Sequence, residues 1–191
     1  KDKKLNLSPY YLKPGFAFGG SCLPKDVRGM NFTAKKLDVE VPLLSSLLKS
    51  NNYQIDRALE IIYQTGKKKI GFLGFAFKEG TDDLRESPVV TLIETLIGKG
   101  YDLSLFDSNV LLSKLLGKNK EYIDDHIPHF GMLLKEELVE VFEHAEVIVI
   151  GNKSFDKKTV NKFIRSKHTL IDLVRVDNNR RSEENYEGIC W

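Results

Sequence analysis

A thiol, an ammonium group and a carboxylate occur within five positions of one glycine-rich stretch. Cys22, Lys25 and Asp26 follow the pair Gly19-Gly20, and a proline two residues after the cysteine suits the first turn of a helix. A helix N-terminus favours the thiolate form of a cysteine, and a thiolate is a strong nucleophile. This grouping predicts covalent catalysis by Cys22, with Asp26 acting through a water. A structural cysteine beside a helix cap is the alternative.

A second polar stretch, "GFLGFAFKEGTDDLRESP", begins inside an apolar strand expected at residues 70–73. Open α/β sheets bind ligands at the carboxyl ends of their strands. Lys78 and Arg85 follow such an end and precede a helix, whose N-terminus favours anions. The stretch therefore predicts an anion site, and a surface ion pair of Arg85 with Asp82 or Glu86 is the alternative.

The same stretch lacks the pattern of a complete dinucleotide site. A dinucleotide fingerprint needs Gly-x-Gly-x-x-Gly and an immediate turn into the helix. Only Gly71 and Gly74 are present, and about a dozen residues precede the helix. Asp107 ends the second expected strand, where a ribose-binding acid would lie. We therefore do not expect this part of the chain to build an NAD site alone.

Strand and helix patterns alternate from residue 67 onward. The expected strands cover residues 70–73, 103–107, 147–150 and 169–173, and the expected helices cover 88–98, 109–116, 133–142 and 156–166. Continuous apolar strands are typical of a sheet that is buried on both faces. The pattern predicts an α/β fold with a doubly wound, mostly parallel, Rossmann-like sheet.

Two helices are expected before this sheet, at residues 25–37 and 42–65. The apolar stripe of the second helix is longer than the preceding segments can cover, so it must face another surface. A second copy of the chain is the occupant that we favour, and the following domain is the alternative. We expect two parts: the cysteine loop with a helical dimerisation segment in 1–66, and the α/β domain in 67–191.

Composition excludes several classes of function. Hydrophobic residues make up 41% of the 191 residues, charged residues 29%, and the formal net charge is +2, so neither disorder nor nucleic-acid binding is indicated. No apolar run approaches the roughly 20 residues of a membrane span. Two cysteines favour a reducing, cytoplasmic setting. His126 and His129 lie in a polar loop without the spacing of a zinc site, so we expect no metal.

The two stretches together carry a resemblance to a known family. "PGFAFGGSCLPKD", followed by "FKEGTDDLRESP", resembles the UDP-glucose/GDP-mannose dehydrogenase family. "YYLKPGFAFGGSCLPKDVR" and the ending "EGICW" are similar to its GDP-mannose branch, which makes the alginate precursor. The resemblance implies oxidation of GDP-mannose to GDP-mannuronate with two NAD, through a thiohemiacetal and a thioester on Cys22.

The resemblance also implies roles for individual residues. Asp26 would position or activate water, and Lys25 and Arg85 would contact the NAD phosphates. Lys78 would contact the nucleotide sugar. The pocket for that substrate, in the same or the partner subunit, would be lined by Tyr10, Tyr11, Lys13, Phe16 and Gly19. Lys13 stands where the family pattern has Arg. A lysine keeps the positive charge but cannot make the two parallel hydrogen bonds of a guanidinium.

Part of the family pattern has no counterpart in these residues. The N-terminal NAD-binding domain is missing, as is the stretch whose Lys and Asn assist the cysteine. We therefore expect the C-terminal portion of such an enzyme, inactive alone, which forms a homodimer or a higher oligomer through the central helix. The alternatives are a UDP-glucose-type 6-dehydrogenase and a non-catalytic nucleotide-binding dimerisation module. A thiol hydrolase is weaker still, because no histidine is evidently paired with Cys22.

Overall fold

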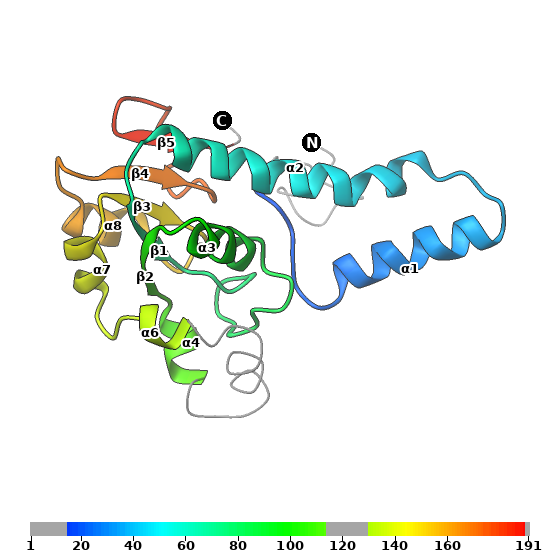
Figure 1. Cartoon of the computed structure of the whole chain (residues 1–191), viewed down its shortest axis with the longest axis horizontal. Helices are drawn as coiled ribbons and strands as arrows, with labels where there is room; N and C mark the ends of the chain where they lie inside the picture. The colour runs from blue at the N-terminus through cyan, green and yellow to red at the C-terminus, as the bar shows by residue number, and fades with distance from the viewer. Residues whose placement is uncertain (1–14, 114–129, 190–191) are drawn as a thin grey trace, which may run out of the picture.

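The computed structural model describes residues 15–113 and 130–189, which form two parts (Figure 1). A helical hairpin of α1 (Leu23–Lys36) and α2 (Pro42–Gln64) projects from an α/β unit. The sheet order is β2-β1-β3-β4-β5, and every pair is parallel. The strands are β1 (Lys69–Leu73), β2 (Asp102–Phe106), β3 (Val147–Ile150), β4 (Thr169–Asp172) and β5 (Tyr186–Gly188). The predicted α/β fold is confirmed.

Helices cover both faces of this sheet. They are α3 (Pro88–Gly98), α4 (Ser108–Ser113), α6 (Phe130–Leu133), α7 (Leu138–His144) and α8 (Lys157–Phe163). Successive side chains of a strand point to opposite faces. In β3, Val147 and Val149 pack into a core with α2 and α3, whereas Ile148 and Ile150 pack into a core with α7 and α8. This two-sided burial explains the continuous apolar strands of the sequence.

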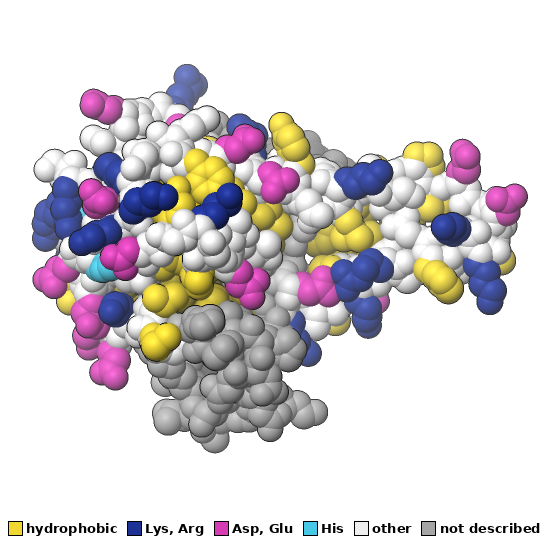
Figure 2. Space-filling view, in the orientation of Figure 1, with side chains coloured by type: hydrophobic (Ala, Val, Ile, Leu, Met, Phe, Trp, Pro, Cys, Tyr) yellow, Lys and Arg dark blue, Asp and Glu magenta, His cyan; other side chains and the backbone are white. Residues whose placement is uncertain are grey.

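The hairpin is only half supported by the α/β unit. In α2 the buried side chains all lie in the second half, at Ile55, Ala58, Leu59 and Ile62. The two helices are tied at their far end by Asn31, whose amide nitrogen donates to the Leu44 carbonyl. Large apolar side chains remain exposed on the hairpin, among them Met30, Phe32, Leu37 and Leu43 (Figure 2). On the apolar face of α1 and its C-cap, made up of Val27, Met30, Ala34 and Leu37, only Val27 is buried.

The expected helix at residues 133–142 is wrong. The chain instead forms α6 and α7, separated by an extended segment in which Leu134 pairs with Leu105 of β2. The Lys135 amide donates to the Leu105 carbonyl, so backbone bonding to the sheet interrupts the helix. Glu137 then starts α7 with a capping box, in which its side chain and that of Glu140 accept each other's backbone amides.

Other boundaries differ by a few residues. The helix expected at 156–166 ends at Phe163, because the Arg165 amide donates to His168 Nδ1 rather than continuing the helix. The strand β5 was not expected, since its three residues are too short to show a pattern. The helix expected at 109–116 is α4, and its end lies outside the described residues. Within the described ranges, no helix is both long and apolar enough to cross a membrane.

Candidate functional site

Cys22 lies at the start of α1 and is exposed to solvent. It is the N-cap residue of this helix: its carbonyl accepts from the Asp26 amide at 2.9 Å, and the chain then continues into a proline at the first turn. Its sulfur lies 3.8 Å from Ser21 Oγ. Lys25 and Asp26 occupy the first turn and form an exposed ion pair at 3.4 Å. The predicted grouping of thiol, cation and carboxylate is therefore present at one helix end.

The loop before Cys22 is anchored to α2 and to the second motif. The Asn51 side chain accepts from the Phe18 amide at 2.7 Å and donates to the Phe18 carbonyl at 2.9 Å. The Gly20 amide donates to the Arg85 carbonyl at 3.2 Å. Gly20 has φ +89°, and a Cβ there would meet the Phe77 ring. The fold thus brings together two motifs that are more than fifty residues apart.

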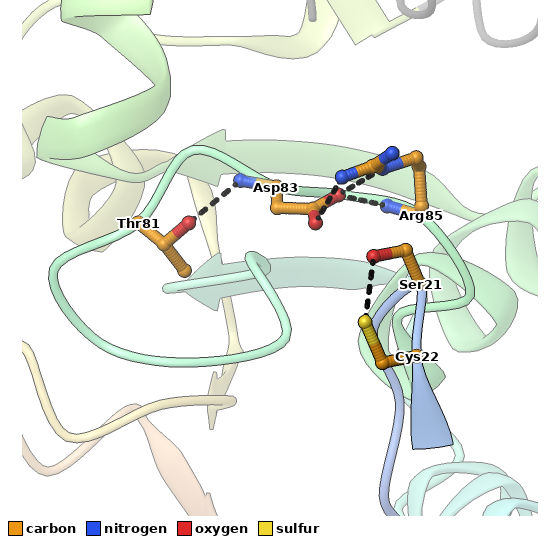
Figure 3. A network of polar contacts seen from close by, with 5 residues as sticks. All are labelled: Ser21, Cys22, Thr81, Asp83 and Arg85. Atoms are coloured by element: carbon orange, nitrogen blue, oxygen red, sulfur yellow. Dashed lines mark hydrogen bonds and ion pairs between the residues drawn. The ribbon is translucent and has the colours of Figure 1, made fainter. Parts of the chain in front are cut away.

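The loop between β1 and α3 is ordered by its own side chains. Thr81 Oγ1 accepts from the Asp83 amide, and Asp83 accepts a fork from Arg85 Nε and Nη2, both at 2.8 Å. Figure 3 shows this pair beside Ser21 and Cys22. The Arg85 hydrogen bonds hold the pKa of the Asp83 carboxyl below its usual value. Arg85 therefore pairs with Asp83, not with the Asp82 or Glu86 considered from the sequence.

Asp107 supports this loop from within the protein. It is fully buried, and its Oδ2 accepts from the amides of Phe75 and Ala76 at 2.9 and 3.2 Å. The same oxygen accepts from Asn152 Nδ2 at 3.3 Å, while Oδ1 accepts from the Asn109 amide at 3.1 Å. Phe75, Ala76 and Asn152 belong to the loops at the carboxyl edge of the sheet, and Asn109 belongs to the first turn of α4. Asp107 therefore holds those loops in place and does not face a ribose.

A pocket of about 400 Å³ opens at that edge, among the loops that follow β1, β3 and β4. Its volume is in the range of small-ligand sites. Among the described residues, its charged lining consists of three cations and one carboxylate, namely Lys78, Lys153, Arg175 and Glu79. Rings of Phe16 and Phe77 add apolar surface. A cationic pocket with aromatic walls suits a ligand that carries phosphate and a flat ring.

The Arg175 side of the pocket has a constrained backbone. Arg175 has φ +58°, a left-handed conformation that is uncommon for residues other than glycine. Buried Asp172 accepts the amides on both sides of it, from Val174 at 3.0 Å and Val176 at 2.8 Å. The Tyr186 hydroxyl donates to the same carboxylate at 2.9 Å. Asp172 therefore fixes the turn that brings Arg175 to the pocket.

The residues predicted from the sequence fall into four groups. Phe16 and Lys78 line the pocket. The second group surrounds the cysteine: Cys22 is the N-cap residue of α1, and Lys25 and Asp26 lie in the first turn of that helix. Arg85 lies in the loop before α3. Gly19 packs beneath the Glu86 carbonyl and the Pro88 ring, where a Cβ would overlap both. Residues that lie outside the described part of the chain are Tyr10, Tyr11 and Lys13, together with His126 and His129.

Several pocket residues were not predicted. Asn152 and Lys153 follow β3, and Arg175 follows β4. The rule that ligands bind at the carboxyl ends of parallel strands applies to them as it does to Lys78. The residues that follow β3 and β4 therefore carried a usable sequence signal, because both strands were expected from the sequence.

The residues present fit only the outer contacts of NAD. Lys25 and Arg85 are exposed cations beside the cysteine loop, as phosphate contacts would be. The connection from β1 to α3 runs through residues 74–87, without the tight glycine turn that lets a backbone approach pyrophosphate. In the part of the chain that the structure describes, no three His, Cys, Asp or Glu side chains are grouped so that they could hold a metal ion.

The fold and these motifs define a class of protein. The family model for the UDP-glucose/GDP-mannose dehydrogenase family, UDP binding domain, matches residues 71–178, and that for the family's central domain matches residues 1–53. The chain belongs to the UDP-glucose/GDP-mannose dehydrogenase family.

Relatives that act on different nucleotide sugars share different degrees of sequence identity with the chain. The chain is 49% identical over its whole length to a GDP-mannose 6-dehydrogenase of Pseudomonas savastanoi pv. phaseolicola, and covers 44% of that protein. It is 28% identical to a UDP-glucose 6-dehydrogenase of Rickettsia felis, with 79% of the chain and 33% of that protein covered. The chain thus spans less than half the length of the curated relatives it matches.

Solved structures agree with the fold. A ternary complex of GDP-mannose dehydrogenase from Pseudomonas aeruginosa superposes with a TM-score of 0.91 at 50% identity, covering all of this chain and 43% of that one. A UDP-glucose dehydrogenase from Pyrobaculum islandicum gives a TM-score of 0.74 at 24% identity, over 93% of this chain and 39% of that one. The second likeness shows the fold alone.

Proposed function

We propose that this chain is the C-terminal, cysteine-bearing part of a dehydrogenase that oxidises GDP-mannose to GDP-mannuronate. The observation that carries the proposal is the docking of the Cys22 loop on the segment whose Lys78 lines the cationic pocket. A thiol and a phosphate-binding pocket in the same fold suit a substrate whose nucleotide is held in the pocket while its sugar reaches the thiol. The 49% identity to GDP-mannose 6-dehydrogenases supports GDP-mannose over UDP-glucose, the alternative substrate.

Cys22 acts twice in this reaction. Its thiolate adds to the carbonyl carbon of the sugar aldehyde, the oxygen takes up a proton, and a thiohemiacetal results. Loss of a hydride from that carbon, with the hydroxyl proton, leaves a thioester. Water then attacks the thioester carbon, the C–S bond breaks, and the uronic acid and the thiolate are released. Asp26 on the first turn of α1 orders or activates that water.

NAD, when bound, would supply the hydride acceptor for both oxidations, that of the sugar's primary alcohol to the aldehyde and that of the thiohemiacetal to the thioester. Lys25 and Arg85 would contact its phosphates, and the cradle for the dinucleotide would come from outside the described residues. We expect that the 191 residues alone do not form NADH with GDP-mannose. NADH formation with this chain as the only protein would contradict that assignment.

The sugar nucleotide is assigned to the pocket at the carboxyl edge of the sheet. Lys78 would contact its phosphates, and Phe16 would line it, together with Gly19, Tyr10, Tyr11 and Lys13. We divide the chain into a cysteine loop and helical segment, 1–66, and a nucleotide-sugar-binding domain, 67–191. The exposed apolar side chains of the hairpin support a homodimer through α1 and α2. The need for a reduced Cys22 supports the cytoplasm as the compartment.

Calorimetric titration of the full-length enzyme with GDP-mannose and UDP-glucose tests the substrate assignment. GDP-mannose should bind more tightly, and Lys78→Met should weaken it about tenfold or more, since a charge-assisted hydrogen bond contributes roughly 1.5–3 kcal/mol. Lys158→Met is the matched control, because Lys158 is exposed on α8 and does not line the pocket. Tighter UDP-glucose binding would favour the alternative substrate, and an unaffected Lys78→Met would remove Lys78 from the site.

A non-catalytic nucleotide-binding module is the second candidate function, and the cationic pocket by itself suits it equally well. The two candidates differ in what they require of the thiol. Substitution of Cys22 abolishes acid formation if the chain is catalytic and leaves both nucleotide binding and acid formation intact if it is not.

A further inference from the structure

An ion pair joins α1 to the segment that precedes α3. Arg28 donates from Nη1 to Glu86 Oε2 at 2.8 Å and from Nη2 to Glu86 Oε1 at 2.5 Å. Two parallel hydrogen bonds of this kind fix the mutual orientation of the two groups as well as their distance. Arg28 lies less than two turns after Cys22, so the pair ties the cysteine end of α1 to a segment 58 residues away in the sequence.

The backbone of Glu86 is itself held in an unusual conformation. It has φ +51°, in the left-handed region. The residues on either side are fixed: the Arg85 carbonyl accepts from Gly20, and the buried Ser87 hydroxyl donates to the Phe75 carbonyl at 2.7 Å. The Glu86 side chain therefore projects from a rigid turn, and its ion pair holds Arg28 of α1 in place relative to that turn.

The cysteine loop packs against this turn. Gly19 lies against the Glu86 carbonyl and the Pro88 ring, and Gly20 lies against the Phe77 ring that lines the pocket. Glu86 thus contacts the loop through its carbonyl at Gly19, and contacts the helix that follows the loop through the fork to Arg28. Loss of the fork removes the side-chain tie between the first half of α1 and this turn, and leaves the packing of Gly19 and Gly20 to hold the cysteine end of the helix.

We propose that Arg28 and Glu86 are positioning residues for the Cys22 thiol. The pair sets the distance between the thiol at the start of α1 and the pocket that holds the nucleotide, without touching the substrate. This inference rests on the proposed function, because a fixed distance between the thiol and the pocket matters only if the thiol must reach a sugar whose nucleotide is held there. A displacement of about 1 Å at a reacting group can cost up to roughly a hundredfold in rate.

Steady-state kinetics of the full-length enzyme provide the first test. Glu86→Gln and Arg28→Gln should each lower kcat about tenfold while KM stays within about twofold, because the thiol is misplaced and the nucleotide contacts remain. The charge-swapped double variant Arg28→Glu/Glu86→Arg should recover most of the lost kcat. Glu183→Gln is the matched control, since it breaks the Arg180–Glu183 pair, which lies within the loop before β5.

Hydrogen exchange of the 191-residue chain provides the second test and needs no activity. The Gly20 amide, which donates to the Arg85 carbonyl, should exchange at least severalfold faster in Glu86→Gln and remain unchanged in Glu183→Gln. Unaltered kcat and unaltered exchange in both fork variants would overturn the inference, as would a lowered melting temperature with normal kcat. If the wild-type enzyme formed no uronic acid, the proposed function would fail, and the exchange result would still decide whether the fork holds the loop.

Discussion

Replacing Asp107 by alanine is expected to destabilise the fold by at least about 3 kcal/mol. The buried carboxylate is the acceptor for the amides of Phe75 and Ala76 and for the Asn152 side chain. Each buried donor left without an acceptor costs roughly 1–3 kcal/mol, and three such donors set the lower bound. Asp107→Asn keeps one oxygen acceptor, so its loss should be smaller, about 1–2 kcal/mol.

Urea unfolding followed by circular dichroism measures these free energies. Asp102→Asn is the control: Asp102 lies at the other end of the same strand and pairs with His144 at the surface, so less than about 1 kcal/mol should be lost. The loops that Asp107 holds also carry Lys78 and Lys153, so nucleotide affinity should fall in Asp107→Asn and not in Asp102→Asn. A loss below about 1 kcal/mol in Asp107→Ala would refute the reasoning.

Three further predictions concern single side chains. Gly19→Ala should cost about 1–3 kcal/mol in unfolding free energy and lower uronic acid formation, because its Cβ would overlap Glu86 and Pro88; Gly29→Ala, with open space around it, should be neutral or stabilising. Tyr186→Phe should lose about 1.5–3 kcal/mol by chemical denaturation, because the bond to buried Asp172 is lost; no loss would contradict the role given to that bond. Burial lowers the pKa of His168, so the unfolded chain binds a proton more readily than the folded chain does. The contribution of His168 to the free energy of unfolding should therefore be constant above about pH 6.5 and decrease as the pH falls below that value. In the same assay, His168→Gln should reduce the loss of unfolding free energy between pH 7.5 and 5.5. An unchanged pH profile would contradict this role of His168.

Most of the sheet could be predicted because its strands are buried on both faces. Runs such as Val147–Ile150 are β-branched and continuous, and the structure places them at the centre of the sheet. The break at Leu134 could not be predicted, because it depends on a backbone bond between Lys135 and Leu105. Helical periodicity continues through such a segment, since it reports side-chain polarity and not backbone partners.

The candidate site was predictable in its chemistry and less so in its geometry. The types and spacing of Cys22, Lys25 and Asp26 predicted that they share a helix N-terminus, and the structure places all three there. The nucleophilic role of the thiol stays a prediction. The pairing of Arg28 with Glu86 could not be found from the sequence, because neither residue belongs to a local pattern and their contact is created by the docking of two distant segments. Gly19 was assigned to the substrate pocket, and the structure gives a further reason for a glycine there, because a Cβ would overlap Glu86 and Pro88.

Acid formation by the Cys22→Ala variant of the full-length enzyme tests the central claim most directly. With GDP-mannose and NAD supplied, the wild-type enzyme should release GDP-mannuronate, and the variant should release none, because no thioester can form. Calorimetry should show that the variant still binds GDP-mannose, since Cys22 does not line the pocket. Undiminished acid formation by Cys22→Ala would contradict the account.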